Sequence, residues 1–396
     1  MRPNPNPLLT RPHTTTHHPP LCQNAHMTTT DVFIRGAGVV GQTLALLLAK
    51  ERLRVTLVQS PAPPQHTPDI RAYALNAASQ QLLDTVKGWP TSAHAVTPVH
   101  HMWVCEPNTD TPAAVRFDAQ ATPLSWIVDV PALEQQLAQA VQYQPSITVI
   151  AANAPAPKAA LTVVCEGKRS HTREQLGFNF DVKPYPHTAV AARLQCSRPH
   201  GGVARQWFAE GDVVALLPLG GEGGQEVALV WSQPHERAQA LLAQPAEAFA
   251  QAVQTVCDHA LGTMQLNGTP AGWPLELSRA TQWVKPGVAL AGDAAHAMHP
   301  LAGQGLNVGL ADVAELARVL AEREYWRELG DIKLLRRYER ARQAHCGQLA
   351  LATDGLFGLF NHSDSRIQAL RRWGLQGFDR LPGLKQWVMQ QAQGVA

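Results

Sequence analysis

The 396-residue sequence predicts an α/β (α+β two-domain) fold, with a Rossmann-like domain interleaved with an antiparallel β-sheet domain and a helical C-terminal tail. Three observations predict it. A strand, a glycine-rich turn and a helix follow one another from residue 31. A second glycine-rich loop follows a short apolar run at 288–291, and β-like segments lie between the two. Hydrophobic residues make up 45% of the chain, enough for a large core or two domains that share an interface.

The first element is a dinucleotide-type unit. Residues 31–35 form a short strand, residues 42–51 a helix with an apolar face, and residues 54–58 a second strand. The turn between the first strand and the helix has the pattern Gly36-x-Gly38-x-x-Gly41. Gly36 permits the tight turn, Gly38 lets a pyrophosphate approach the backbone, and Gly41 lets the helix pack closely on the strand. The glycine pattern alone is weak evidence for a dinucleotide-binding unit, but the surrounding strand–helix–strand order makes the evidence strong.

The second strand ends at Gln59, where an acidic residue commonly holds the adenosine ribose. A carboxylate accepts from both ribose hydroxyls, whereas an amide accepts from one and donates to the other. The loss of binding free energy is about 1 kcal/mol, the usual net value of one hydrogen bond. Weaker or differently made nucleotide binding is therefore expected.

The second glycine-rich loop spans residues 292–307. The strand at 288–291 stops at Gly292-Asp293, and a helix is expected to begin near Leu306. Such a loop offers N–H groups and the positive end of a helix dipole to an anion. Asp293 is placed to accept hydrogen bonds from a polyol, and the turn from Gly303 through Gln304, Gly305 and Leu306 to Asn307 suits the edge of a planar ring.

The middle of the chain alternates between β-like and helix-like segments. Strands are expected at 101–105, 178–182, 190–195, 213–217 and 227–231, and helices at 132–143 and 246–260. This alternation predicts a nucleotide-binding domain from residues 27–98, 126–180 and 276–330, a second domain from 99–125 and 181–275, and C-terminal helices at 331–396.

Composition narrows the function class. A net charge of +2 and the lack of long basic runs give no reason to expect nucleic-acid binding. Six scattered cysteines without Cys-x-x-Cys pairs suggest reduced thiols in a cytosolic protein. Residues 1–26 have no apolar core, so we expect a disordered extension and a true start at Met27.

Three local features have competing interpretations. His296 and His299 are three residues apart, but no further ligand has suitable spacing, so no metal is expected. Arg71 is either a surface charge or part of the cofactor cleft. The aromatic and basic cluster around residues 371–373 either packs as a helix pair or contacts an anionic membrane surface.

The two glycine motifs, in this order and at this separation, resemble those of class A FAD-dependent aromatic monooxygenases of the para-hydroxybenzoate hydroxylase-like fold. The chain is most similar to the ubiquinone-biosynthesis hydroxylase family. The segment 69–79 resembles that family's Arg-containing segment, and 163–173 resembles its Asp-Gly motif. The chain departs from the family pattern at Gln59 and at Glu166, where the family has aspartate.

The resemblance implies FAD as cofactor, NAD(P)H as co-substrate and O₂ as oxidant. It implies hydroxylation of the ring of a lipophilic polyprenylated phenol through a C4a-hydroperoxyflavin, at the inner face of the cytoplasmic membrane and alongside other quinone-biosynthesis enzymes. No catalytic residue is assigned, although His299 and Pro300 lie in the flavin-facing loop. The implied cofactor contacts are Gly36, Gly38, Gly41, Gln59, Arg71, Gly292, Asp293, Gly303, Gln304, Gly305, Leu306 and Asn307.

Two other functions stay open on the sequence. One is a flavin-dependent reductase of an isoprenoid substrate, which would keep the fold and FAD but would not consume O₂. The other is a non-catalytic scaffold of a quinone-synthesis complex, which the departures from the family pattern at Gln59 and Glu166 suggest. The complete loop from Gly292 to Asn307 argues against the scaffold, because a protein without a cofactor has no need of that sequence.

Overall fold

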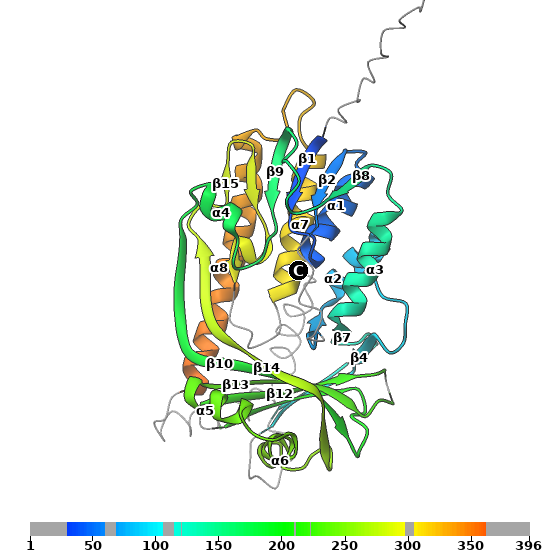
Figure 1. Cartoon of the computed structure of the whole chain (residues 1–396), viewed down its shortest axis with the longest axis vertical. Coiled ribbons are helices and arrows are strands. Elements are labelled where there is room, and N and C mark those ends of the chain that lie inside the picture. The colour runs from blue at the N-terminus through cyan, green and yellow to red at the C-terminus, as the bar shows by residue number, and fades with distance from the viewer. Residues whose placement is uncertain are drawn as a thin grey trace, which may run out of the picture.

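The computed structural model describes residues 30–59, 69–105, 115–119, 121–209, 211–221, 223–297 and 305–361. Figure 1 shows two β-sheet layers, one at each end of the molecule's long axis, with helices packed around the upper one. The expected extension at 1–26, the loop residues 298–304 and the cluster around 371–373 lie outside the described residues.

The upper layer is a six-stranded sheet of order β15-β16-β9-β1-β2-β8, and every neighbouring pair is parallel except β15–β16. Its short strands are mainly apolar, as expected of a parallel sheet covered on both faces. They are β1 (Thr30–Arg35), β2 (Val55–Val58), β8 (Ile147–Ile150), β9 (Ala159–Val164), β15 (Val284–Lys285) and β16 (Val288–Leu290). The strand order reverses direction at β1, and ligands of such sheets bind in the crevice beyond the carboxyl ends of the strands at this point.

Helices cover this sheet. The expected helix at 42–51 is α1 (Val39–Lys50), the helix expected near Leu306 is α7 (Gly305–Ala321), and α8 (Ile332–Asn361) follows it. The helix expected at 132–143 is α3 (Val130–Gln142), which Asp129 caps by accepting from the Ala132 N–H. Two shorter helices, α2 (Ala77–Thr85) and α4 (His171–Gln175), are capped by Asn76 and Ser170.

The lower layer is an eight-stranded sheet of order β17-β14-β10-β13-β12-β11-β5-β6. Its strands are β5 (His101–Cys105), β6 (Val115–Asp118), β10 (Phe180–Cys196), β11 (Val203–Ala209), β12 (Asp212–Leu219), β13 (Glu226–Pro234), β14 (Met264–Ala280) and β17 (His296–Ala297). The sheet is antiparallel as expected, apart from β5 and β11, which pair in parallel. These two strands come from separate passages of the chain through this layer, so no hairpin fixes their relative direction.

A third sheet, which the sequence pattern did not indicate, lies between the two layers. It has three antiparallel strands in the order β3-β7-β4, formed by β3 (Ala72–Leu75), β4 (Val96–Val99) and β7 (Ser125–Asp129). Buried apolar side chains pack it against β12, among them Val99, Ile127 and Leu219. This sheet therefore joins the two layers.

The strands expected at 178–182 and 190–195 are one continuous strand, β10, of 17 residues. Its partner β14 is equally long, and the register between them shifts between Pro184 and Thr188. Proline cannot donate to a sheet ladder, so Pro184 and Pro186 mark the irregularity where the pair bends. The prolines interrupt the pairing without ending the strand, and in Figure 1 both strands curve along the side of the molecule between the two layers.

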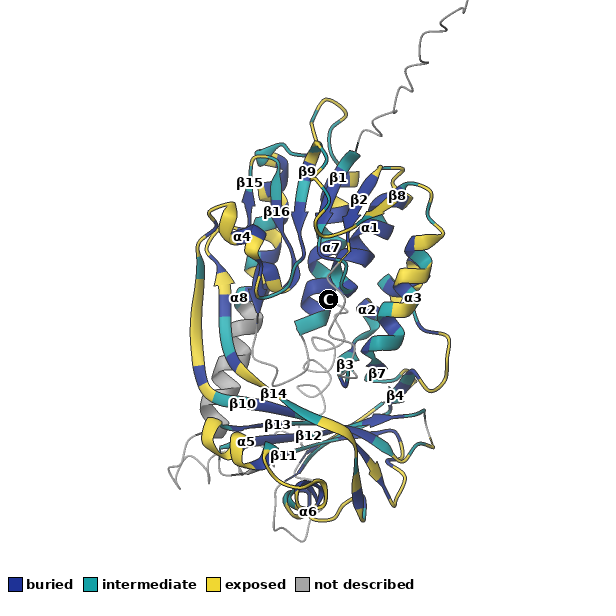
Figure 2. Ribbon diagram, viewed as in Figure 1, coloured by how far each residue is buried: buried dark blue, intermediate teal, exposed yellow. Residues whose placement is uncertain are grey.

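Each layer has its own apolar core. The larger core lies between the parallel sheet and α1, α3, α7 and α8, and Figure 2 shows the inner strands and helix faces buried there. The second core lies under α5 (His235–Leu242) and α6 (Ala246–Val256) on the lower sheet. Among the described helices, none is long and apolar enough to cross a membrane.

Candidate cofactor and active site

The glycine turn after β1 has the close contacts that its pattern predicts. Gly36 has φ +106°, and a Cβ there would lie 2.4 Å from the Cys165 carbonyl oxygen. A Cβ on Gly41 would lie 1.9 Å from the Gly36 carbonyl oxygen. A Cβ on Gly38 would meet no atom within 4 Å. Gly36 and Gly41 are therefore required by the protein's own packing, whereas the space at Gly38 is open to a ligand.

The N-terminus of α1 has the features of an anion-binding site. Gly38 is its N-cap and offers no side-chain hydrogen bond, so the first N–H groups of the helix have no side-chain cap. Gln42 in the first turn donates from Nε2 to the Ala37 carbonyl at 2.7 Å. Its Oε1 is buried without a partner among the described residues. The uncapped N–H groups and the open backbone at Gly38 together fit the pyrophosphate end of a dinucleotide, whereas Gln42 Oε1 can only accept a hydrogen bond from a donor such as a hydroxyl.

The second glycine segment lies against the first. Gly292 has φ +61°, and a Cβ there would contact Val40 of α1 at 3.3 Å. Gly309 of α7 is equally close, because its Cβ would lie 3.0 Å from Val40 Cγ2 and 3.4 Å from the Gly292 Cα. These small residues bring α1 together with the β16 turn and α7, although α1 is about 250 or more residues away from both in the sequence.

Asp293 follows in this turn, and its side chain is exposed. Burial by the surrounding protein nevertheless raises the pKa of its carboxyl above the usual range, against the opposing charges of His296, Lys168 and Arg71. A group that solvent reaches but protein surrounds lies in a concave position. Asp293 is thus placed to accept hydrogen bonds from a polyol such as the ribityl chain of a flavin.

Arg71 lies beside this position in a network of its own. Its guanidinium donates to Asp69 Oδ1 at 2.9 Å and to Glu134 Oε1 at 3.3 Å. Hydrogen bonding to Asp69 raises the pKa of Arg71, and the charge of Arg71 opposes the raised pKa values of Tyr73 and Asp293. Arg71 is half-buried and near enough to influence both groups, so it is not an isolated surface charge.

Asn307 anchors the start of α7. Its Oδ1 accepts from the Asn76 N–H at 3.0 Å and from Ser79 Oγ at 2.7 Å, and its Nδ2 donates to the Ala74 carbonyl at 2.8 Å. The amide therefore binds the turn between β3 and α2, and a cofactor at this position would meet the backbone of α7. The remaining N-terminal residues of α7, Gly305 and Leu306, are partly exposed.

Glu166, where the chain departs from the family pattern, organises the loop after β9. Its carboxylate accepts from Arg35 Nε at 2.8 Å, from Ser170 Oγ at 2.7 Å and from Thr172 Oγ1 at 2.6 Å. These hydrogen bonds outweigh burial and lower its pKa. Arg173, which follows Thr172 in the chain, donates to the Ala294 carbonyl at 3.2 Å, and its guanidinium lies over the Phe180 ring. The loop therefore supports the turn that carries Asp293.

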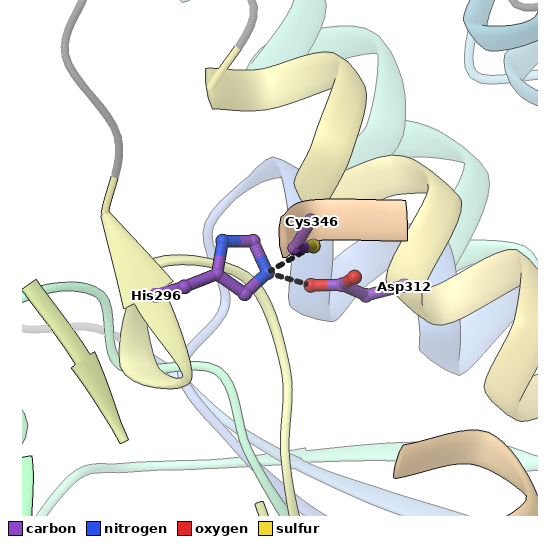
Figure 3. Close-up of side chains that lie close together, drawn as sticks. All are labelled: His296, Asp312 and Cys346. Atoms are coloured by element: carbon purple, nitrogen blue, oxygen red, sulfur yellow. Dashed lines mark hydrogen bonds and ion pairs between the residues drawn. The ribbon is translucent and has the colours of Figure 1, made fainter. Parts of the chain in front are cut away.

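His296 belongs to a buried ion-pair network that sequence reasoning missed (Figure 3). Its Nε2 lies 2.6 Å from Asp312 Oδ2 and 3.9 Å from Cys346 Sγ. Arg342 Nε donates to the other oxygen of Asp312 at 2.7 Å, and the Gly292 N–H donates to Oδ2 at 3.0 Å. Nothing in the spacing indicated these partners, because Asp312 and Cys346 are 16 and 50 residues from His296.

The same network bears on metal binding. Ligand atoms of His296, Asp312 and Cys346 lie within 4.8 Å of one another, a grouping that the residue spacing did not predict. The Asp312 carboxylate is already matched by Arg342, whose guanidinium would repel an added cation. Burial would lower the pKa of His296, but the charge and hydrogen bond of Asp312 raise it to about 10. The arrangement fits a closed ion-pair network better than a metal centre.

The remaining expected contacts are Gln59, which follows the pairing of Val58 with Arg35 just before Gly36, and residues of the loop that precedes α7. Gln59 is exposed at the end of β2, and its backbone N–H donates to the Ile150 carbonyl at 2.8 Å. His299, Pro300, Gly303 and Gln304 fall outside the described residues. Gly36, Gly38, Gly292, Asp293 and Asn307 thus come together, with Arg71 beside them.

A family model and several known proteins are similar to this chain. A family model described as "FAD binding domain" matches residues 155–353. Ubiquinone hydroxylase UbiL of Rhodospirillum rubrum is 31% identical over 390 residues, covering 92% of this chain and 89% of the relative. The 3-demethoxyubiquinol 3-hydroxylase of Escherichia coli is 29% identical, covering 92% and 99%.

The fold is that of solved flavoproteins. The p-nitrophenol 4-monooxygenase of Pseudomonas putida superposes with a TM-score of 0.73 at 18% identity, covering 93% of this chain and 99% of that protein. The fold, the open glycine turn and the full-length sequence identity lead to one conclusion. The chain belongs to the ubiquinone-biosynthesis hydroxylase family and is an FAD-dependent monooxygenase.

Proposed function

We propose that the protein hydroxylates the aromatic ring of a polyprenylated phenol, with NAD(P)H as the electron donor and O₂ as the oxygen source. The observation that carries the proposal is the meeting of the open Gly38 turn with the segment that bears Asp293. The names of the relatives support the substrate class, since one is a ubiquinone hydroxylase and another a 3-demethoxyubiquinol 3-hydroxylase.

The residues present fit FAD, and each has a distinct task. The uncapped N-terminus of α1 and the open backbone at Gly38 would hold the pyrophosphate. Asp293 would accept hydrogen bonds from the ribityl hydroxyls. The N-terminus of α7, fixed by Asn307, would present N–H groups and the positive end of its dipole to the pyrimidine edge of the ring, which favours negative charge there.

Bound FAD would supply the redox chemistry, in which two electrons from NAD(P)H allow one atom of O₂ to enter the ring and the other to leave as water. The protein supplies position, exclusion of water and electrostatics. A buried histidine of the lower layer can serve the fold and need not act as a base. His200, for example, is buried with Nε2 2.8 Å from the Leu219 carbonyl and Nδ1 accepting from the Gly202 N–H, so both its ring nitrogens serve the fold.

The place of action follows from the substrate. A polyprenylated phenol stays in lipid, so we place the enzyme peripherally at the inner face of the cytoplasmic membrane, where other quinone-biosynthesis enzymes would be its neighbours. The domain boundaries expected from the sequence remain part of this proposal. Flotation of the protein with lipid vesicles tests the location, and protein that stays at the bottom of the gradient would contradict it.

The first test of the function is the visible spectrum of the protein purified from residue 27 onward, followed by NAD(P)H oxidation in the presence of a prenylated phenol. We expect a flavin spectrum, phenol-stimulated oxidation, O₂ consumption and a product one oxygen atom heavier. NAD(P)H oxidation of an isoprenoid without O₂ consumption would indicate the reductase instead. A colourless protein that does not take up added FAD would favour the scaffold.

A further inference from the structure

A cavity of about 420 Å³ lies between the end of β14, β17 and α8. Its lining includes Leu277, Ser278, Ala280, Trp283, His296 and Gly347. None of the lining residues belongs to the Gly36–Gly41 turn, and neither Asp293 nor Asn307 is among them. The cavity is thus separate from those proposed cofactor contacts that the structure describes, although His296 follows shortly after Asp293 in the chain.

Two buried polar groups on the wall of this cavity have unused hydrogen-bonding capacity. Ser278 is 1% exposed, and its Oγ has no partner among the described residues. His296 is 5% exposed and uses only Nε2, toward Asp312 and Cys346. In Figure 3 its Nδ1 points away from both, and no described residue binds it. A buried hydroxyl without a partner, such as that of Ser278, is rare in folded proteins and calls for an explanation.

The charge around the cavity is positive. Asp312 holds His296 in its protonated form, so Nδ1 carries a proton and is a charge-assisted donor. Arg342 binds the same carboxylate, so two cations share one anion. Arg279 also lines the cavity. The other walls are mainly apolar, and an apolar pocket with a few convergent polar groups is the usual form of a small-molecule site.

We propose that this cavity binds an apolar molecule carrying a carboxylate, with its oxygens toward Ser278 Oγ and His296 Nδ1. Two donors on one wall suit the two oxygens of a carboxylate, and the positive network behind His296 favours an anion over a neutral group. This site is additional to the cleft in which the hydroxylation is proposed to occur, and its argument does not depend on that reaction.

Gly347 permits a test that fills the cavity without disturbing the network. It lies within α8 and lines the cavity, and a Cβ there would meet no atom within 4 Å. Gly347→Leu therefore places a side chain in open space and replaces a poor helix former by a good one. Gly347→Ala is the matched control, because it has the same helical advantage but leaves most of the cavity free.

The probe is 2-naphthoate, titrated calorimetrically into the FAD-loaded full-length protein, with 2-naphthylmethanol as its neutral counterpart. We expect 2-naphthoate to bind at least about tenfold more tightly than the alcohol, since its charge meets a buried cation. Gly347→Leu should abolish the binding and Gly347→Ala should keep it. Ser278→Ala should weaken it about fivefold, the loss of one hydrogen bond.

Two results would overturn the proposal: no binding of 2-naphthoate by the wild-type protein, or equal binding by wild type and Gly347→Leu. Thermal unfolding of each variant shows whether the fold is kept, and Ser278→Ala should not lower stability because it removes an unpaired buried hydroxyl. Turnover is not measured in this experiment. Failure here would therefore leave the proposed hydroxylation untouched, and failure of the hydroxylation assay would leave this site untouched.

Discussion

Replacing His296 by glutamine should remove a large part of the pH dependence of stability. Burial alone would lower the pKa of His296, but Asp312 raises it to about 10 in the folded protein. An unfolded histidine has a pKa of about 6.5. The protonated ring is thus favoured by folding, so its contribution is complete below about pH 6.5 and is lost as the pH rises toward about 10.

The magnitude follows from the proton count. Between these two pKa values the folded state holds one more proton than the unfolded state. The free energy of unfolding therefore falls by about 1.4 kcal/mol for each unit by which the pH rises. From about pH 7 to about pH 8.5, His296 should account for a loss of about 2 kcal/mol. Glutamine can still donate to Asp312, while Arg342 keeps the carboxylate paired.

Urea denaturation of the FAD-loaded wild type and His296→Gln at several pH values in this window measures the effect. Burial raises the pKa of the Cys165 thiol, and its titration also lowers stability with rising pH. Both proteins contain this cysteine, so the difference between their slopes isolates His296. Parallel pH profiles would refute the reasoning, because His296 would then not be held protonated by Asp312.

Three further predictions concern the cofactor site. Gly41→Ala should prevent folding or FAD retention because its Cβ would overlap the Gly36 carbonyl, whereas Gly38→Ala should fold and lose FAD affinity; circular dichroism and FAD titration separate the two. Asn307→Ala should lower the free energy of unfolding by about 2–3 kcal/mol, since it removes the hydrogen bonds to Ala74, Asn76 and Ser79; an unchanged urea midpoint would contradict this. Asp293→Asn should weaken FAD binding about tenfold at unchanged thermal stability, and equal affinity by fluorescence titration would exclude its role toward the ribityl chain.

The sequence patterns predicted the local units well and their combinations less well. The turn from Gly36 to Gly41 was predictable, because each glycine answers a steric need that lies within a few residues or one neighbouring strand. The pairing of β5 with β11 and the middle sheet of β3, β7 and β4 were not, because they join segments far apart in the chain. Two prolines made β10 look like two strands, although the strand continues through them.

The candidate site divides in the same way. The positions of Asp293 after β16 and of Asn307 at the start of α7 were predictable from the loop that contains them, and their contacts with a cofactor stay a prediction. The partners of His296 could not, since only the packing of α7 and α8 brings Asp312, Arg342 and Cys346 to it. The use of the Asn307 side chain to hold the β3–α2 turn also has no signal in the local sequence.

The order of strands in the upper sheet has a consequence for synthesis on the ribosome. β1 at residues 30–35 pairs with β9 at residues 159–164, and β9 in turn pairs with β16 at residues 288–290. A growing chain therefore presents β1 with an open edge until more than a hundred further residues have been made, and the sheet is completed only late in translation. Such long-range pairing folds slowly and exposes strand edges to other chains. The nascent protein should thus depend on chaperones that bind unpaired strands, and shortened chains that end before β16 should aggregate.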